Sequence, residues 1–185
     1  EGLDHHGYVG HSLVVYEDLL HVPLIVRYPR DYPAGKRRSS PVSTRRVFHT
    51  ILEAAGFSER VTSEREEAVA AQVEALSLSR TGEDAAAEQD VPFAEAYSPV
   101  TLVNLMAHRN PEAVEAFRCR STRRAVYAGR HKLLSVDEQA EELFDLEADP
   151  AELDNRFADW AELAAQLEAQ LEACLMAARE RRHVG

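Results

Sequence analysis

The sequence predicts an α/β fold in its first third, followed by a small antiparallel sheet packed with a helix. Three observations carry this prediction. The apolar run VPLIV at residues 22–26 is typical of a strand buried on both faces, as in a parallel sheet. Three short apolar segments between residues 123 and 146 indicate an antiparallel meander. From Trp160 onward, apolar residues recur every three or four positions, which predicts an amphipathic helix lying on the meander.

In the first third, a loop, a helix, a strand and a second helix are expected in order. Residues 1–11 are rich in glycine and histidine, and residues 12–20 have helix-compatible spacing before the apolar run. The stretch VSTRRVFHTILEAAG predicts a helix that begins after Ser43 or Thr44 and stops at Gly56. Pro23 is compatible with a strand only at its start or at a sheet edge.

The composition changes between residues 58 and 90, which are rich in Glu, Ala and Ser. Ser63 and Glu66 have the spacing of a capping box, and TGEDAAAEQD is typical of a linker. We therefore expect three parts: the end of an α/β domain at 1–57, a linker or variable insertion at 58–90, and an α+β subdomain at 91–185.

The second half has the pattern of an α+β subdomain. DVPFAEAY predicts a strand, and Asn110 followed by Pro111 predicts a helix start. RRAVYAG, RHKLLSV and EELFDL predict the three strands of the meander, and Asp149-Pro150 interrupts the chain before the last helix.

The net charge of −11 at pH 7 argues against a protein that binds nucleic-acid backbones through a basic face. The sequence contains no apolar stretch long enough for a membrane span, and no signal peptide is visible. The two cysteines, Cys119 and Cys174, are not in a CxxC pair and are expected to be ordinary buried thiols. Arginines beside Cys119 leave a reactive thiol as the less favoured alternative.

Histidines cluster near the N-terminus, at His5, His6 and His11, with Asp4 beside them. Three interpretations remain open from these residues: a metal site, a polar loop with hydrogen-bonded histidines, and a loop that faces a substrate. Adjacent side chains diverge and no helical HxxxH pair is present, so the residues alone favour the polar loop. GxSxG and Walker motifs are absent from the sequence, so no complete nucleophilic constellation is visible.

The stretch EGLDHHGYVGHSLVVYEDLLHVPLIVRYP resembles the sulfatase family of the alkaline phosphatase superfamily. VEALSLSRTGED is similar to the family's Gly-x-Ser-Leu linker, with Ala75 in place of the glycine. RRAVYAGRHKLL and EELFDLEADPAELDN are similar to its C-terminal strands and its Glu-Leu-Tyr-Asp-Leu…Asp-Pro-x-Glu…Asn signature, with Phe144 in place of the tyrosine. The resemblance covers nearly the whole chain. The family's first motifs stand here, in order, at Glu1, His6-Gly7, His11, Tyr16-Glu17 and Val22-Pro23-Leu24-Ile25.

The resemblance implies the C-terminal part of an alkaline-phosphatase-like α/β sandwich, with the small C-terminal sheet and helix after it. Family members carry a Cys/Ser-x-Pro-x-Arg motif whose first residue becomes the formylglycine nucleophile, and this sequence contains no such motif. The ligands of a divalent metal, expected to be calcium, would also lie upstream, so no metal ligand is assigned here. By resemblance His11 contacts the sulfate or protonates the leaving oxygen, and His6 is a second substrate-binding residue. Tyr16 and Glu17 are expected to fix the loop against the sheet.

The expected function is therefore that of a sulfatase fragment, inactive alone, whose whole enzyme cleaves a sulfated small molecule or glycan with the help of the missing N-terminal part. Two alternatives remain. One is a phosphodiesterase or phosphonate monoester hydrolase of the same superfamily, since sulfate and phosphate esters are similar tetrahedral anions. The other is a non-catalytic remnant or interaction module that uses the acidic C-terminal helix. Ser12 stands where many family members have a lysine.

Overall fold

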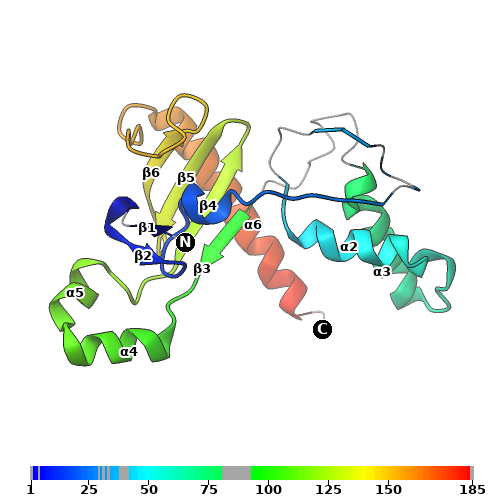
Figure 1. Cartoon of the computed structure of the whole chain (residues 1–185), viewed down its shortest axis with the longest axis horizontal. Coiled ribbons are helices and arrows are strands. Elements are labelled where there is room, and N and C mark those ends of the chain that lie inside the picture. Colours follow the sequence, from blue (N-terminus) through cyan, green and yellow to red (C-terminus); the bar gives the residue numbers. More distant parts are fainter. Residues whose placement is uncertain are drawn as a thin grey trace. The chain divides into compact units, whose positions relative to one another are not determined.

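A computed structural model describes residues 2–3, 5–28, 30, 32, 34–37, 42–80 and 93–183 (Figure 1). The chain forms two compact units. The sheet unit comprises Glu1–Pro23 and Phe93–Gly185, and the helical unit comprises Leu24–Pro92. The first boundary falls after Pro23 and not at the expected residue 57, because the first 23 residues pack with the C-terminal sheet. The second falls after Pro92, close to the expected residue 90.

The sheet unit is built on a four-stranded antiparallel meander in the order β3-β4-β5-β6. This confirms the predicted meander and the strand predicted in DVPFAEAY. Gly129 and Asp137, both with positive φ, lie in the two turns that join its last three strands. The strands are β3 (Phe93–Ala96), β4 (Arg123–Ala128), β5 (His131–Val136) and β6 (Gln139–Asp145).

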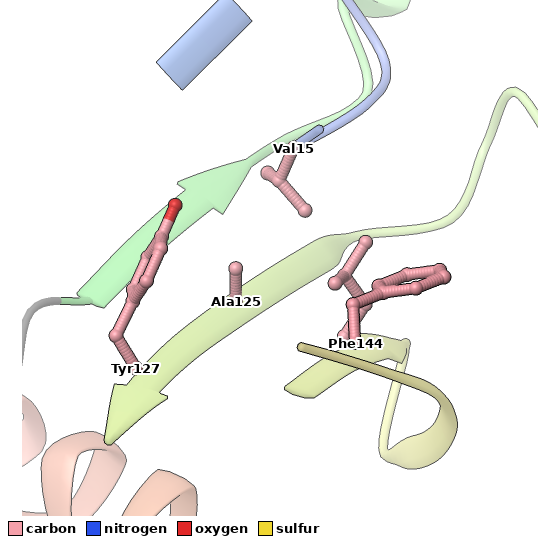
Figure 2. Packing of buried hydrophobic residues seen from close by; sticks show 5 residues of the cluster. Val15, Ala125, Tyr127 and Phe144 are labelled. Atoms are coloured by element: carbon pink, nitrogen blue, oxygen red, sulfur yellow. The ribbon is translucent and has the colours of Figure 1, made fainter. Parts of the chain in front are cut away.

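Apolar side chains cover both faces of this sheet. On one face, Val15 from the N-terminal segment packs against the buried residues Ala125, Tyr127, Leu134 and Phe144 (Figure 2). Helix α6 (Ala161–His183) contacts β4, β5 and β6, as predicted for the amphipathic C-terminal helix. Its buried side chains are Ala164, Leu167 and Leu171. Each large apolar side chain buried in this way contributes roughly 1.5–3 kcal/mol.

Two short helices, α4 (Val100–Arg109) and α5 (Pro111–Ala116), precede the meander. The Asn110 side chain accepts a hydrogen bond from the backbone N–H of Ala113 at 3.0 Å, which confirms the predicted cap. These helices bury Val103 and Val114 in a second cluster with Leu13 and Cys119.

The N-terminal segment contains a small hairpin and one short helix. Strands β1 (Gly2–Leu3) and β2 (Val9–Gly10) pair around the 3-10 helix η1 (His5–Gly7), and α1 spans only Glu17–Leu20. The helix predicted at 12–20 is therefore shorter than expected. Leu13 has a φ of +78°, and Val14 and Val15 are buried in non-helical backbone, as suits β-branched residues.

The strand predicted at residues 22–26 is wrong, since residues 21–28 are all described and contain no strand. Val22 and Leu24 are exposed, and Ile25 is 89% exposed. An apolar run predicts burial, but a strand also needs hydrogen bonds from a neighbouring strand. None of the described strands pairs with this segment.

The helical unit contains α2 (Arg45–Ala54) and α3 (Glu64–Leu76), with the 3-10 helices η2 (Phe57–Glu59) and η3 (Leu78–Arg80). Gly56, with a φ of +68°, ends α2 as predicted. The Ser63 hydroxyl accepts from the Glu66 N–H and donates to the Glu66 carboxylate, which confirms the capping box. The predicted linker at 81–90 lies outside the described residues.

Candidate functional site

The candidate site begins at the N-terminal hairpin of the sheet unit. His6 lies within η1 and has a left-handed backbone conformation, with φ of 56° and ψ of 19°. That conformation costs a residue with a Cβ roughly 1–2 kcal/mol, so surrounding contacts must hold it in place. The next residue, Gly7, also has a positive φ, and a Cβ there would lie 3.3 Å from the Phe117 ring. Glycine therefore lets the hairpin approach Phe117 closely.

Two contacts fix the imidazole ring of His6. The ring stacks on Tyr16, with centroids 3.7 Å apart and planes inclined by 8°. Its Nε2 lies 3.2 Å from the backbone carbonyl oxygen of Ala151, which follows Pro150 in the loop after β6. His6 thus joins two segments that lie 145 residues apart in the sequence.

His6 also lines a surface hollow of about 480 Å³ within the sheet unit. Among the described residues, the rest of its lining is Glu17, Asp18, His21, Pro23, Pro150, Ala151 and Glu152. The hollow is therefore rich in groups that accept or exchange protons. His21 Nδ1 lies 3.8 Å from Glu17 Oε2, which also places His21 next to α1.

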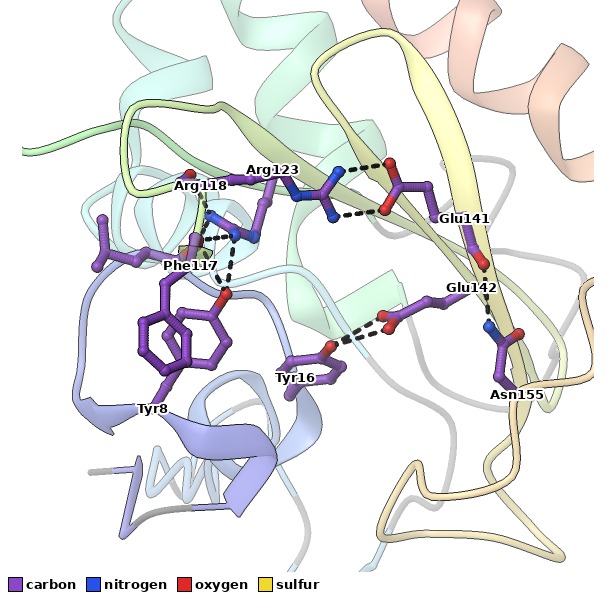
Figure 3. A network of polar contacts seen from close by, with 9 residues as sticks. Tyr8, Tyr16, Phe117, Arg118, Arg123, Glu141, Glu142 and Asn155 are labelled. Atoms are coloured by element: carbon purple, nitrogen blue, oxygen red, sulfur yellow. Dashed lines mark hydrogen bonds and ion pairs between the residues drawn. The ribbon is translucent and has the colours of Figure 1, made fainter. Parts of the chain in front are cut away.

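Tyr16 connects the hairpin to the sheet. Its hydroxyl donates to the Glu142 carboxylate on β6, at 3.1 Å and 2.9 Å from the two oxygens (Figure 3). Burial and the Glu142 charge raise the pKa of Tyr16, so the phenol stays protonated at physiological pH. The ring that supports His6 is therefore neutral.

Glu17 takes part in a buried charged cluster centred on Lys132 of β5. The Lys132 ammonium is fully buried and lies 2.8 Å from Glu17 Oε1 and 2.7 Å from Glu152 Oε1. Tyr127 donates to Glu17 Oε1 at 2.6 Å, and the Glu17 backbone N–H donates to Glu152 Oε2 at 2.6 Å. These contacts confirm the expectation that Tyr16 and Glu17 fix the loop against the sheet.

The charges in this cluster do not balance, since two carboxylates face one ammonium. Burial raises the pKa of Glu152, and the Lys132 charge opposes that rise. Burial and the hydrogen bond to Glu17 raise the pKa of Tyr127. Lys132 is therefore the group that allows two glutamates to sit together inside the protein.

A second buried cation, Arg123, holds the other end of the N-terminal segment. Its guanidinium donates to the Leu13 carbonyl at 2.9 Å, to the Tyr8 hydroxyl at 2.9 Å and to the Phe117 carbonyl at 2.7 Å (Figure 3). Burial raises the pKa of Tyr8, and Arg123 opposes the rise. The segment from Tyr8 to Glu17 is thus attached to the sheet at both ends.

The other residues predicted for the site do not line the hollow or lie outside the described residues. His11 directly follows β2 and is exposed. The lining of the hollow, as far as it is described, includes His6 and not His11. Glu1 and Asp4 lie outside the described residues, and His5 is described only by its backbone.

Within the described residues, no group of three or more His, Cys, Asp or Glu side chains is arranged to hold a metal ion. Cys119 is buried, and burial raises the pKa of its thiol, as expected for a structural rather than a reactive cysteine. The helices of the described ranges include none that is long and apolar enough to cross a membrane.

Lys132, Glu152 and Tyr127 were not among the site residues predicted from the sequence. One signal was available for Lys132, which is a charged residue two positions from Leu134 in a strand with a buried face. Its partners lie 115 residues before it and in a loop after it, so spacing alone does not connect them.

Comparisons with protein-family models, with curated proteins and with solved structures gave no match.

Proposed function

We propose that this chain is the C-terminal part of a sulfatase-like hydrolase of the alkaline phosphatase superfamily, which in its whole form cleaves sulfate esters. One observation carries the proposal. Three separate stretches that resemble family motifs each contribute one charged residue to the same buried cluster.

The three residues are Glu17 of the Tyr-Glu pair, Lys132 of RHKLL and Glu152 of DPAE. The Glu17 contacts span 115 residues to Lys132 and 135 residues to Glu152. Unrelated short matches have no reason to converge in space, whereas motifs of one family persist together when their residues hold one structure. This convergence supports the resemblance independently of the order of the motifs.

The proposed roles of His6 and His11 follow from their chemistry. An imidazolium donates hydrogen bonds to an anionic ester, and histidine can protonate a leaving oxygen near neutral pH. His11 is exposed beside the hairpin, and His6 lines the hollow. We assign His11 to the leaving oxygen or the sulfate, and His6 to the sulfate.

The nucleophile and the metal ligands belong, in this proposal, to a preceding segment of the same enzyme. Among the described residues, no group of three or more His, Cys, Asp or Glu side chains could hold a metal ion. Residues 1–57 would then be the end of an alkaline-phosphatase-like α/β sandwich. The substrate would be a sulfated small molecule or glycan.

The first test is the reading frame upstream of the codon for Glu1. We expect it to encode Cys/Ser-x-Pro-x-Arg, and we expect the longer polypeptide, matured to formylglycine, to hydrolyse para-nitrophenyl sulfate. His11→Ala should lower kcat/KM by roughly 10²–10⁴-fold, the usual contribution of a general acid. His108→Ala on the exposed surface of α4 is the matched control and should leave kcat/KM unchanged.

Three results would contradict the proposal. A start codon directly before Glu1 would favour a non-catalytic interaction module. Preference for a phosphodiester or a phosphonate monoester over the sulfate would replace the proposed substrate class. Turnover of para-nitrophenyl sulfate by the 185-residue chain alone would show that the nucleophile lies within it.

A further inference from the structure

The two contacts of the His6 ring define which nitrogen carries its proton. A backbone carbonyl oxygen only accepts hydrogen bonds, so the contact to Ala151 requires a hydrogen on Nε2. In the neutral ring, Nδ1 is then the acceptor. The His6 ring also stacks on Tyr16, so a rotation that breaks the hydrogen bond to Ala151 would disturb the stacking as well.

The two residues that contact His6, Ala151 and Tyr16, directly precede Glu152 and Glu17, which are hydrogen-bonded to each other. Glu152 directly follows Ala151, and its Oε2 accepts from the backbone N–H of Glu17, which directly follows Tyr16. One carboxylate therefore ties together the two chain segments between which the His6 ring lies. The distance of 2.6 Å makes this a short hydrogen bond to a charged acceptor.

Glu152 is itself held firmly. Its side chain is 1% exposed, and Lys132 Nζ lies 2.7 Å from Oε1. Its backbone has a φ of +56°, and Pro150 restricts the loop two residues earlier. A strained backbone conformation of this kind persists only where surrounding contacts hold it. Here the contacts of the buried Glu152 carboxylate do so.

We propose that Glu152, held by Lys132, is a positioning residue for His6: it keeps the Ala151 carbonyl where it accepts the hydrogen bond from Nε2–H, so that neutral His6 presents Nδ1 as its acceptor. The consequence for catalysis rests on the proposed function. With Nε2 engaged, His6 can donate to an ester oxygen only through a protonated Nδ1. Glu152 therefore sets which ring atom meets the substrate.

The test is nuclear magnetic resonance of the whole chain with isotope-labelled histidine. The variant His6→Gln identifies the His6 signals by their loss. We expect wild-type His6 to be in the Nε2–H form, with ring protons shielded by Tyr16. In Glu152→Gln, the neutral amide loses the ion pair with Lys132 and accepts more weakly from the Glu17 N–H, so we expect the ratio of Nε2–H to Nδ1–H forms to fall roughly fivefold.

Tyr127→Phe is the matched control, because it removes a hydrogen bond from the same cluster but leaves the Glu152 contacts intact. We expect its His6 spectrum to match the wild type. Glu141→Gln, which breaks the Arg118 ion pair elsewhere in the sheet unit, should also leave His6 unchanged. An Nδ1–H form in the wild-type protein, which requires no variant to fold, would overturn the proposal. An equal change in Tyr127→Phe and Glu152→Gln would also overturn it.

These spectra involve no ester, so they are separate from the test of the proposed function. An inactive whole enzyme would contradict that function while leaving the tautomer result intact. In an active whole enzyme, Glu152→Gln should lower kcat/KM roughly fivefold, and Tyr127→Phe should not. An unchanged kcat/KM beside a changed tautomer would overturn the positioning role.

Discussion

The two compact units bury their side chains differently. The sheet unit encloses fully buried apolar residues on its strands, such as Val126, Leu133 and Leu143, and places carboxylates against its buried Lys132. The helical unit exposes Phe48 and Ile51 on α2. Its buried residues, among those described, include Arg46 and Ser77 besides Val73 and Leu78.

This difference indicates where the stability of the chain resides. Apolar area removed from water supplies most of the favourable free energy of folding, and the sheet unit has much more of it. In the helical unit, the side chains of Ser77 and Ser79 both donate to Glu53, so hydrogen bonds replace part of an apolar core. A hydrogen bond adds little net free energy to folding, because the same groups bond to water in the unfolded chain. We therefore expect the sheet unit to be stable and the helical unit to be marginal.

A matched pair of phenylalanines gives the largest expected effect. Phe144 is 2% exposed in the sheet unit, and Phe48 is 60% exposed in the helical unit. Phe144→Ala should lower the free energy of unfolding by about 4 kcal/mol through lost burial and the cavity left behind. Phe48→Ala should change it by less than about 0.5 kcal/mol.

Urea unfolding separates the two cases. Trp160, the single tryptophan, contacts Arg156 and His131 and reports on the sheet unit by fluorescence. Amide hydrogen exchange in α2 and α3 reports on the helical unit. Equal losses in the two variants would mean that Phe48 is buried in solution, and the comparison would fail.

The cluster around Lys132 provides the next effect. Lys132→Met leaves two buried carboxylates facing each other without their ammonium, and should lower the free energy of unfolding by about 3 kcal/mol at neutral pH. The control is Lys36→Met, at the chain's other lysine, which is exposed in the helical unit. Fluorescence of Trp160 in urea measures Lys132→Met, and amide exchange in α2 and α3 measures Lys36→Met. A similar small change in the two variants would contradict a structural role for the cluster.

The loss in Lys132→Met should shrink as the pH falls. Burial raises the pKa of Glu152 above its ordinary value near 4.5, and removing Lys132 removes the main opposing effect. A carboxyl with a higher pKa when folded binds more protons in the folded state, so its contribution to stability increases as pH falls toward the unfolded value. Each unit by which the folded pKa exceeds the unfolded pKa corresponds to about 1.4 kcal/mol. A constant loss from about pH 7 down to pH 5 would contradict this sign.

The contrast between the units also explains what the sequence could predict. Strands β4, β5 and β6 were predictable because they follow one another in the sequence and pair with each other. One short stretch of sequence therefore contains each strand together with its pairing partner. The segment at residues 22–26 has an equally clear apolar run. Its run says nothing about a neighbouring strand, and in the structure Ile25 is exposed. Hydrophobicity predicts a tendency to be buried, and only a partner turns that tendency into a strand.

The candidate site shows the same limit. His6 was suggested as a substrate-binding residue by the family resemblance alone and stays a prediction, whereas the capping residues Ser63 and Asn110 were predictable because their partners lie three residues away. One of the two contacts that fix the His6 ring comes from the Ala151 carbonyl, 145 residues later, and Glu152 joins that segment to the backbone of Glu17. Such pairs leave no periodic signal in a single sequence, because their meeting depends on how the loop after β6 folds back.

Exposed apolar residues at positions 22–25, where the chain passes from the sheet unit to the helical unit, predict self-association. Ile25 is 89% exposed, beside the exposed residues Val22 and Leu24. Burying one isoleucine in an intermolecular contact contributes about 2 kcal/mol, so Ile25→Ser should weaken association roughly thirtyfold. Leu153→Ser, at an exposed leucine distant in sequence from this run, is the control and should have little effect. Sedimentation over a range of concentrations measures this, and a monomeric wild-type chain throughout would contradict the prediction.

The two helix caps give the smallest effect and the most direct test of whether the units unfold separately. Ser63 caps α3 in the helical unit, and Asn110 caps α5 in the sheet unit. Replacing either by alanine should cost about 1 kcal/mol. If the units unfold separately, Ser63→Ala speeds amide exchange in α3 without shifting the Trp160 transition, whereas Asn110→Ala shifts that transition. A shift of the Trp160 transition in Ser63→Ala would instead show that the two units unfold cooperatively, and the marginal stability expected for the helical unit would then be shared with the sheet.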